Sequence, residues 1–170
     1  ILIIRKEILK ELENKDAKIP CILDWNLYDK SNSLYNTPAI FNIYLIDKLL
    51  EYYNSCGGVD YFEQISKEKA RLVYDLLDNS NLFKPVVTNI KARSNINIPF
   101  IIEDENIRSN FLEYCYNNNI VGLRTKTPFK YSDFNMIEPL RISLYNGISL
   151  EDTKSLIKVM NDFEKMLIIE

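Results

Sequence analysis

The residue types best suited to chemistry lie at the start of an apolar segment, in the tripeptide Asn36-Thr37-Pro38. Threonine is a good N-cap, and proline fits the first helical turn, where its missing N–H costs no hydrogen bond. The tripeptide therefore predicts a helix start with free backbone N–H groups, a hydroxyl, an amide and the positive end of the helix dipole. Such a start can bind a phosphate or a carboxylate. A plain helix cap is the alternative, and it would account for Thr37 completely.

Arg141 is the second candidate, because it alternates with Ile142 and Leu144 in a predicted strand. Period-two alternation places the arginine on the face opposite those apolar side chains. A guanidinium binds a carboxylate through two parallel hydrogen bonds, a geometry that lysine does not offer. Arg141 is therefore a candidate for binding a substrate carboxylate. The alternative is a surface arginine that is exposed or paired with an acid.

Composition excludes several other chemistries. The 170 residues include no histidine, which excludes Ser-His-Asp and Cys-His catalysis and most zinc sites. The three cysteines are far apart and are expected to be reduced, as in the cytoplasm. The carboxylates show no metal-ligand spacing, so no metal site is predicted. The net charge of −3 argues against nucleic acid as a partner. No apolar run approaches the ~20 residues of a membrane span, so no membrane association is expected.

The elements expected in the first 60 residues must position Asn36 and Thr37. Apolar residues at 40–46 cover almost the whole circumference of the predicted helix, so this helix is expected to be buried. It should run from Pro38 to about Asn54, where Gly57-Gly58 stops it. The other elements expected there are a buried strand at Ile1–Ile4, a helix or turn at Lys6–Glu13, a strand at Pro20–Leu23 and a loop at Asp24–Ser33.

The rest of the chain alternates between helical and strand patterns. Apolar residues alternate with polar ones around Ile98, which predicts a strand with one buried face. Pro99 suggests that this is an edge strand or that it contains a bulge. The other predicted elements are a helix that ends at Asp78–Asn81, a helix around Ile107–Cys115, strands at Val121–Leu123 and Arg141–Leu144, and a final helix capped by Ser149. The buried stripe predicted for this final helix consists of Thr153, Leu156, Ile157, Met160, Phe163 and Leu167. This order predicts a small α+β domain with helices on one face of a short sheet.

Five segments, in order and with compatible spacing, carry a family resemblance. They are Ser33–Phe41 with its Asn-Thr-Pro, Gly57-Gly58 before a helix, Arg93–Phe100, Gly122-Leu123-Arg124, and Leu140–Gly147 with Arg141. Together they resemble phosphoserine aminotransferases, which are pyridoxal phosphate (PLP) enzymes of fold type I. The resemblance covers nearly the whole chain and corresponds to roughly the second half of such an enzyme.

The resemblance implies an α/β fold class with two parts. Residues 1–60 would be the C-terminal part of the PLP-binding large domain. Residues 61–170 would be the small C-terminal domain, an α+β domain whose short, mainly antiparallel sheet is covered by helices. The composition break near residue 60 is faint, so this boundary depends on the resemblance.

The resemblance also implies a function for the parent enzyme, a cytoplasmic homodimer of serine biosynthesis. It would transfer an amino group between glutamate and 3-phosphohydroxypyruvate. Asn36 and Thr37 would contact the phosphate of PLP bound mainly by the partner subunit, and Arg141 would bind the α-carboxylate of the amino-acid substrate. The lysine that forms the Schiff base would lie upstream of Ile1–Ile4, so Lys6 is not that lysine. No catalytic residue is therefore expected in this chain, which should not be active alone.

The sequence departs from the family pattern after Arg124. A His-Arg pair of the family is replaced by Lys126 and Thr127, and a longer loop, Pro128–Pro139, follows. Lys126 or Lys130 could supply the positive charge for the substrate, but only as a point charge. A surface loop without a binding role is the alternative. The departure leaves open a related PLP aminotransferase with a different substrate, and a non-catalytic dimerisation module is a third possibility.

Overall fold

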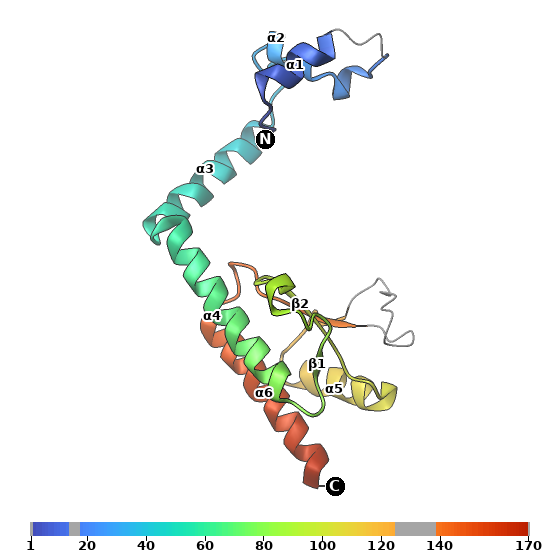
Figure 1. Ribbon diagram of the computed structural model, residues 1–170. Coiled ribbons are helices and arrows are strands. Elements are labelled where there is room, and N and C mark those ends of the chain that lie inside the picture. Colours follow the sequence, from blue (N-terminus) through green and yellow to red (C-terminus); the bar gives the residue numbers. More distant parts are fainter. Residues whose placement is uncertain (1, 14–17, 125–138, 170) are drawn as a thin grey trace. The chain divides into compact units, whose positions relative to one another are not determined.

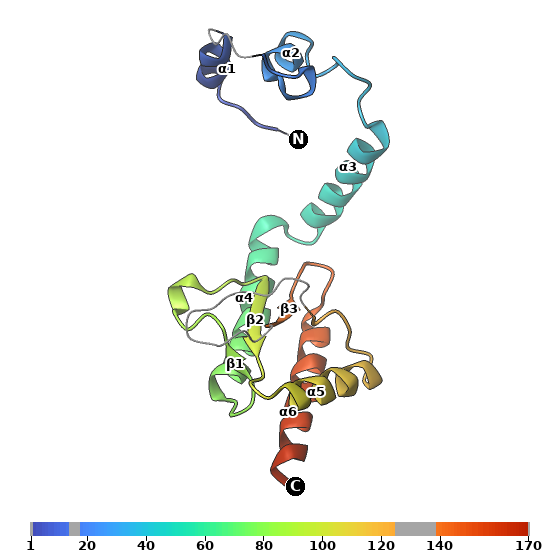
Figure 2. The same cartoon turned by 90° about the vertical axis from the view of Figure 1, so that its right-hand side faces the viewer.

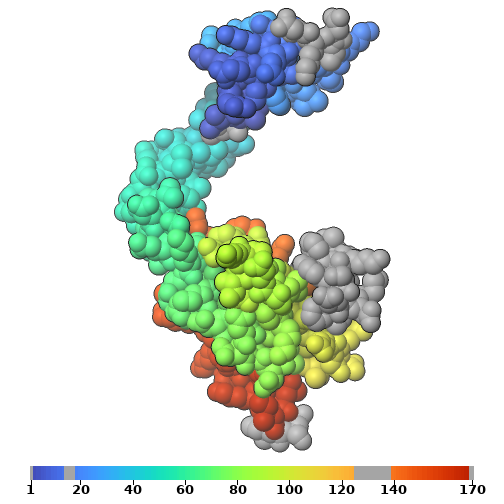
Figure 3. Space-filling model, viewed as in Figure 1, coloured from blue at the N-terminus to red at the C-terminus, as the bar shows by residue number. Residues whose placement is uncertain are grey.

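The computed structural model describes residues 2–13, 18–124 and 139–169 (Figure 1). The chain divides into two compact units, Ile1–Tyr52 and Tyr53–Glu170. Figure 3 shows their surfaces in the same colours, from blue to cyan for the first unit and from green to red for the second. The division lies inside helix α3 (Ile40–Ser55), whereas residue 60 lies in the first turn of helix α4 (Gly58–Asn79).

The described part of the first unit is helical. Helix α1 (Lys6–Glu13) lies where a helix or turn is predicted. The predicted strand at Ile1–Ile4 is wrong, since Leu2 and Ile3 lie in irregular backbone and are 63% and 93% exposed. A strand needs a neighbouring strand to satisfy its N–H and C=O groups, and the described residues of this unit contain none.

Two further segments of this unit fold locally and correct the predictions. The segment Pro20–Leu23, expected to be a strand, contains the 3-10 helix η1 (Cys21–Leu23). Helix α2 (Trp25–Lys30) replaces the loop predicted at Asp24–Ser33. The carboxylate of Asp24 caps α2 by accepting two backbone N–H groups of the first turn at 3.1 and 3.3 Å. The helix is too short to show an apolar period, so the cap is its main sequence signal.

Helix α3 is apolar around its circumference and yet exposed, which corrects the prediction that it is buried. None of its residues is buried, and Ile40 and Phe41 are 68% and 69% exposed. The helix also begins at Ile40 and not at Pro38, because its first hydrogen bond runs from the N–H of Ile43 to the carbonyl of Ala39 at 3.0 Å. Its apolar pattern calls for a packing surface that the described part of this unit does not supply.

The second unit is an α+β domain, as predicted, with a three-stranded antiparallel sheet in the order β1-β2-β3 (Figures 1 and 2). Helices α4 and α6 run side by side against this sheet in both views. The elements that follow α4 are β1 (Lys84–Pro85), the 3-10 helix η2 (Ile90–Ala92), β2 (Asn97–Ile101), α5 (Glu105–Asn117), β3 (Leu140–Ser143) and α6 (Leu150–Ile169).

The core of this unit contains a cluster of phenylalanines between the sheet and the helices. Phe83, Phe100 and Phe111 are each 0% exposed, and the centroids of their rings lie 5.0–6.4 Å apart. Phe163 of α6 joins the cluster with its centroid 5.2 Å from that of Phe111. Edge-to-face pairs of this kind add to the stabilisation from buried apolar area. The cluster therefore joins the sheet, α5 and α6 into one packed body.

Pro99 lies in the central strand, which corrects the prediction of an edge strand or a bulge. It pairs with Arg141 of β3, and its carbonyl accepts the N–H of Val86 at 3.1 Å on the β1 side. The N–H and C=O of one residue point to the same neighbouring strand, so the missing donor also faces β1. Strand β1 has only two residues, Lys84 and Pro85. The proline therefore removes one hydrogen bond at the end of a very short strand.

The last helix begins as predicted. Ser149 Oγ accepts the N–H of Asp152 at 3.0 Å, and the Asp152 carboxylate accepts the N–H of Ser149 at 2.9 Å. This reciprocal arrangement satisfies two backbone donors at the helix start. The predicted buried stripe of α6 is confirmed at its four most buried members, Thr153, Leu156, Met160 and Phe163.

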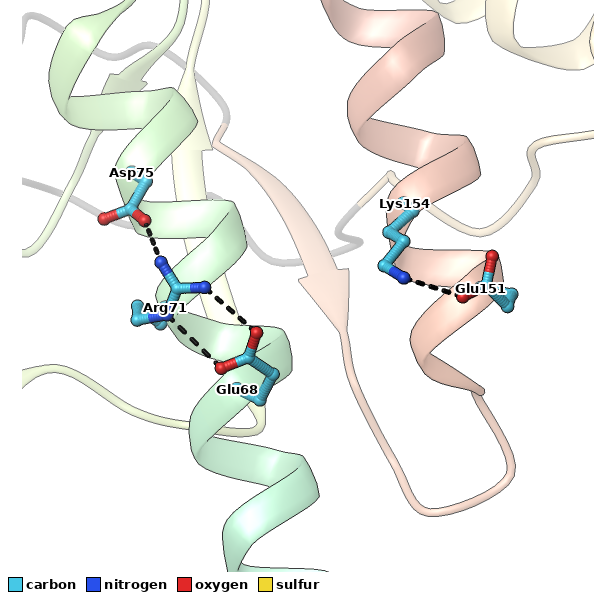
Figure 4. A network of polar contacts seen from close by, with 5 residues as sticks. All are labelled: Glu68, Arg71, Asp75, Glu151 and Lys154. Atoms are coloured by element: carbon cyan, nitrogen blue, oxygen red, sulfur yellow. Dashed lines mark hydrogen bonds and ion pairs between the residues drawn. The ribbon is translucent and has the colours of Figure 1, made fainter.

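Ion pairs lie on the exposed surfaces of α4 and α6 (Figure 4). Arg71 donates to Glu68 at 2.9 Å and to Asp75 at 2.7 Å, and Lys154 donates to Glu151 at 2.7 Å. The hydrogen bond from Arg71 lowers the pKa of the Glu68 carboxyl. These side chains are 44–79% exposed, so solvent screens the pairs and their effect on stability is small.

Candidate functional site

The start of α3 offers free hydrogen-bond donors to solvent. Asn36 and Thr37 are exposed just before this helix. Among the described residues, the backbone N–H groups of Ala39, Phe41 and Asn42 have no acceptor. Thr37 accepts no N–H from the first turn of the helix, so its hydroxyl is not used as the predicted cap. Donors at the positive end of a helix dipole favour a bound anion.

The side chain of Asn36 is held by Tyr28, which was not predicted to belong to the site. Asn36 Nδ2 donates to the Tyr28 hydroxyl at 2.9 Å. The ring of Tyr28 contacts the ring of Tyr35 edge-to-face, with centroids 5.8 Å apart. A hydrogen bond with the Cys21 thiol raises the pKa of Tyr35. These contacts tie the Asn36 segment to α2 and η1, while the second amide N–H of Asn36 stays available to a ligand.

The chain turns sharply between α2 and Asn36. Asn32 and Ser33 both adopt positive φ angles, of 49° and 65°. Asparagine tolerates this left-handed conformation, whereas serine adopts it less readily. The turn is held by the N–H of Ser33, which donates to the Tyr28 carbonyl at 2.8 Å. Tyr28 therefore contacts the segment through its carbonyl as well as through its hydroxyl.

Arg141 lies on the solvent-exposed face of the β-sheet, as its alternation with Ile142 and Leu144 predicts. Its side chain is exposed, whereas Ile142 and Leu144 are 2% and 1% exposed. The backbone N–H of Arg141 donates to the Leu123 carbonyl at 2.8 Å, which holds the strand on its outer side. Val121–Leu123 lies in irregular backbone and is not a strand, contrary to prediction, but Leu123 still supports β3 through this bond. The Arg141 guanidinium is exposed, and no described residue pairs with it.

A polar network flanks Arg141 on the same face of the sheet. Ser143 Oγ donates to Asn97 Oδ1 at 3.1 Å, and Asn97 Nδ2 is 3.4 Å from the Tyr145 hydroxyl. Asn97 and Ser143 lie opposite each other in the β2–β3 register. All three residues lie in the segments that carry the family resemblance, but no role was predicted for them. The period-two spacing of Arg141, Ser143 and Tyr145 is the signal that could have placed them together.

The predicted site residues fall into two groups, one in each unit of the chain. Asn36 and Thr37 belong to the first unit, and Arg141 belongs to the second. Lys126 lies outside the described residues, as do Thr127 and Lys130. The described residues contain no group of three or more Cys, Asp or Glu side chains placed to hold a metal ion. None of the helices in this part of the chain has the length and apolar character needed to cross a membrane.

Comparison with known proteins shows which proteins this chain is related to. No protein-family model matches the chain. The phosphoserine aminotransferase of Bacillus subtilis is 32% identical over 91% of this chain and 41% of its own length. That of Lysinibacillus sphaericus is 34% identical over 97% of this chain and 42% of its own length. The chain is homologous to the C-terminal portion of phosphoserine aminotransferases. It spans about 42% of the length of these relatives.

Solved structures of phosphoserine aminotransferases have the same fold as this chain. The enzyme from Bacillus circulans subsp. alkalophilus matches with a TM-score of 0.76 and 30% identity, over 92% of this chain and 42% of its own. A PLP-bound phosphoserine aminotransferase from Trichomonas vaginalis matches with a TM-score of 0.70 and 26% identity, over 89% and 41%. The predicted resemblance and fold class are therefore confirmed.

Proposed function

We propose that this chain is the C-terminal portion of a PLP-dependent phosphoserine aminotransferase. The complete enzyme would transfer an amino group between glutamate and 3-phosphohydroxypyruvate in serine biosynthesis, in the cytoplasm. The observation that carries the proposal is the exposed start of α3, where three free backbone N–H groups lie beside Asn36 and Thr37. This arrangement suits the phosphate of PLP, and the homology to phosphoserine aminotransferases supports that ligand over other anions.

The cofactor would supply the electron sink that stabilises negative charge at the substrate α-carbon. The residues of this chain would bind and orient the cofactor and the substrate. The backbone donors of α3, the Thr37 hydroxyl and the free amide N–H of Asn36 would hold the phosphate, and the dipole of α3 would favour its negative charge. The lysine that bonds to PLP is expected upstream of residue 1. The chain alone is therefore expected to be inactive.

Arg141 would bind the α-carboxylate of the amino-acid substrate through two hydrogen bonds. Its exposed guanidinium has no partner among the described residues, and it can donate two parallel hydrogen bonds to a carboxylate. The network of Asn97, Ser143 and Tyr145 would keep β3 in register beside it. Lys126 would add positive charge near the distal phosphate or carboxylate of the substrate.

The proposal includes a homodimer, with residues 1–60 in the large domain and 61–170 in the small domain. The phosphate site at Asn36 and Thr37 would serve the PLP of the partner subunit. The exposed apolar side chains of α3 would then be covered in the complete dimer. The burial of apolar area at such an interface would stabilise the dimer.

Steady-state kinetics of the complete enzyme tests this function. With 2-oxoglutarate as amino acceptor, kcat/KM for phosphoserine should exceed that for alanine or serine by about 100-fold, because a bound phosphate contributes several hydrogen bonds and ionic contacts. Replacement of the His-Arg pair of the family by Lys126 and Thr127 favours a second candidate, a PLP aminotransferase with another substrate. A preference for an unphosphorylated amino acid in this assay would establish that second function.

A further inference from the structure

A lysine that has no counter-ion among the described residues is buried in the second unit. Lys69 of α4 is 1% exposed, and no described carboxylate lies within reach of it. Its Nζ donates to the carbonyls of Leu144, Tyr145 and Ile148 at 3.1, 3.1 and 2.8 Å. The three N–H groups of the ammonium therefore meet three carbonyl oxygens. Burial lowers the pKa of Lys69, whereas the three carbonyl acceptors favour its charged form.

Burying the Lys69 ammonium costs free energy. Removing an ammonium from water is unfavourable unless its hydrogen bonds are replaced, and here neutral carbonyls replace all of them. Lysines elsewhere on the helices behave differently. Lys67, two residues earlier in α4, is 60% exposed and pairs with Glu63. The buried position of Lys69 therefore reflects a requirement of the turn between β3 and α6.

The turn that Lys69 binds continues directly from the strand that carries Arg141. At the end of this strand, the N–H of Leu144 donates to the Ile96 carbonyl at 2.7 Å. The Tyr145 hydroxyl meets Asn97 Nδ2 of the neighbouring strand at 3.4 Å. Lys69 adds a third support, from α4. The end of β3 is thus held by β2 and by α4, with Arg141 only three residues before Leu144.

We propose that Lys69 is a positioning residue for the binding of the substrate carboxylate. By holding three carbonyls of the β3–α6 turn, it fixes the end of β3 and so the direction of the Arg141 guanidinium. The inference rests on the proposed function of Arg141. Two parallel hydrogen bonds to a carboxylate tolerate little displacement, so a loosened strand lowers affinity for the substrate. The affinity for PLP does not depend on this strand in the proposed arrangement.

The test uses the complete enzyme with Lys69→Met, whose unbranched side chain is one heavy atom shorter and has no hydrogen-bond donors. KM for phosphoserine and for glutamate should rise about tenfold, with kcat changed less than about twofold, because ground-state and transition-state binding are lost together. PLP affinity should stay the same. The matched control is Lys67→Met, which removes an exposed lysine of the same helix and should change neither KM nor kcat. An unchanged KM in a folded Lys69→Met enzyme overturns the proposal, even if the thermal midpoint falls.

Hydrogen exchange measured by mass spectrometry gives a second readout that does not depend on activity. Amides in the peptide 144–149 should exchange about tenfold faster in Lys69→Met than in wild type, while peptides of α5 should not change. Equal protection in both enzymes overturns the proposal. Should Lys69→Met fail to fold, Lys69→Gln retains two donors and should give a smaller rise in both KM and exchange rate. A wild-type enzyme without amino transfer refutes the proposed function, whereas normal transfer with an unchanged KM in the variants refutes the role of Lys69 alone.

Discussion

The two units differ in how they use apolar side chains. No described residue of the first unit, Ile1–Tyr52, is buried, although α3 is apolar around its circumference. The second unit, Tyr53–Glu170, buries Phe83, Phe100 and Phe111 of its phenylalanine cluster completely. Apolar content alone therefore does not produce a core. A core forms where the chain also supplies the opposite surface, as β2, α5 and α6 do for one another.

The same contrast separates the two groups of predicted site residues, one in each unit. Arg141 lies on a sheet with a packed core beneath it, and its strand is supported by Asn97 and Lys69. Asn36 and Thr37 depend on local contacts with Tyr28 and on exposed backbone donors. We therefore expect changes in the two units to affect different quantities and to differ in size.

The largest expected effect comes from the core of the second unit. Phe100→Ala should lower the free energy of unfolding by about 3–5 kcal/mol, because it leaves a cavity beside Phe83 and Phe111. Phe41→Ala in α3 should change it by less than about 0.5 kcal/mol, since this ring is 69% exposed. Urea unfolding of the 170-residue chain, followed by circular dichroism, compares them. Similar losses for both variants would contradict the contrast between the units.

Arg141→Lys tests whether the two groups of site residues bind different ligands. The variant keeps the charge and loses the second hydrogen bond to the carboxylate, so KM for phosphoserine should rise about tenfold to hundredfold in the complete enzyme. The dissociation constant of PLP should not change, because the proposed phosphate ligands are Asn36, Thr37 and the start of α3, not Arg141. A weakened affinity for PLP without a change in KM would mean that Arg141 has been given the wrong ligand.

Ser149→Ala removes the cap of α6. Its hydroxyl accepts the N–H of Asp152, and no other described group replaces it there. The free energy of unfolding should fall by about 1 kcal/mol. Ser149→Asp keeps an acceptor at the same position and should restore most of the loss. The comparison is again made in urea, and an unstable Ser149→Asp variant would show that the hydroxyl has another role.

Acid should weaken the second unit partly through Asp78. Hydrogen bonds from Arg93 hold the pKa of Asp78 below its ordinary value of about 3.9. The folded state therefore binds protons less readily than the unfolded state, so this contribution is present above pH 4 and is lost as the pH falls through the folded pKa. The side chain of Asp78 is 42% exposed, so the expected contribution is at most about 1 kcal/mol. Asp78→Asn should flatten the acid limb of a stability–pH curve. An unchanged slope would show that this carboxyl does not contribute to the loss of stability in acid.

The smallest expected effect is that of Arg71→Ala. This side chain joins Glu68 and Asp75 on the surface of α4 and is 56% exposed (Figure 4). Alanine also has the highest helix propensity, which offsets the lost pairs. The urea midpoint should stay within experimental error at physiological salt. A clear loss of stability would mean that these surface pairs matter more than their exposure indicates.

Much of the second unit could be predicted from its sequence because local and packing signals agree there. The alternation around Ile98 and Ile142, the cap at Ser149 and the apolar stripe of α6 all describe faces that pack within the same unit. The central position of Pro99 could not be predicted, because it depends on how short β1 is. Lys69 and its acceptors lie 75–79 residues apart, so no local pattern reveals that contact.

The first unit was harder to predict because its apolar segments find no surface to pack against among the described residues of the unit. Ile1–Ile4 and α3 read as buried elements, yet Ile3 is 93% exposed and no residue of α3 is buried. Asn36 and Thr37 were found from residue type and resemblance. The support from Tyr28 was not, because a contact between a helix and the loop that follows it has no regular spacing.

The dissociation constant of PLP for the complete enzyme tests the central claim most directly. The variant Asn36→Ala/Thr37→Val removes the amide and the hydroxyl beside the start of α3 and leaves the backbone donors in place. Thr88→Val, which changes an exposed threonine of the second unit, is the matched control. The account predicts that the double variant binds PLP at least about tenfold more weakly, which is the loss of one or two hydrogen bonds to a charged group, and that the control binds it like wild type. Equal affinity of wild type and double variant would contradict the assignment of this helix start as the phosphate site.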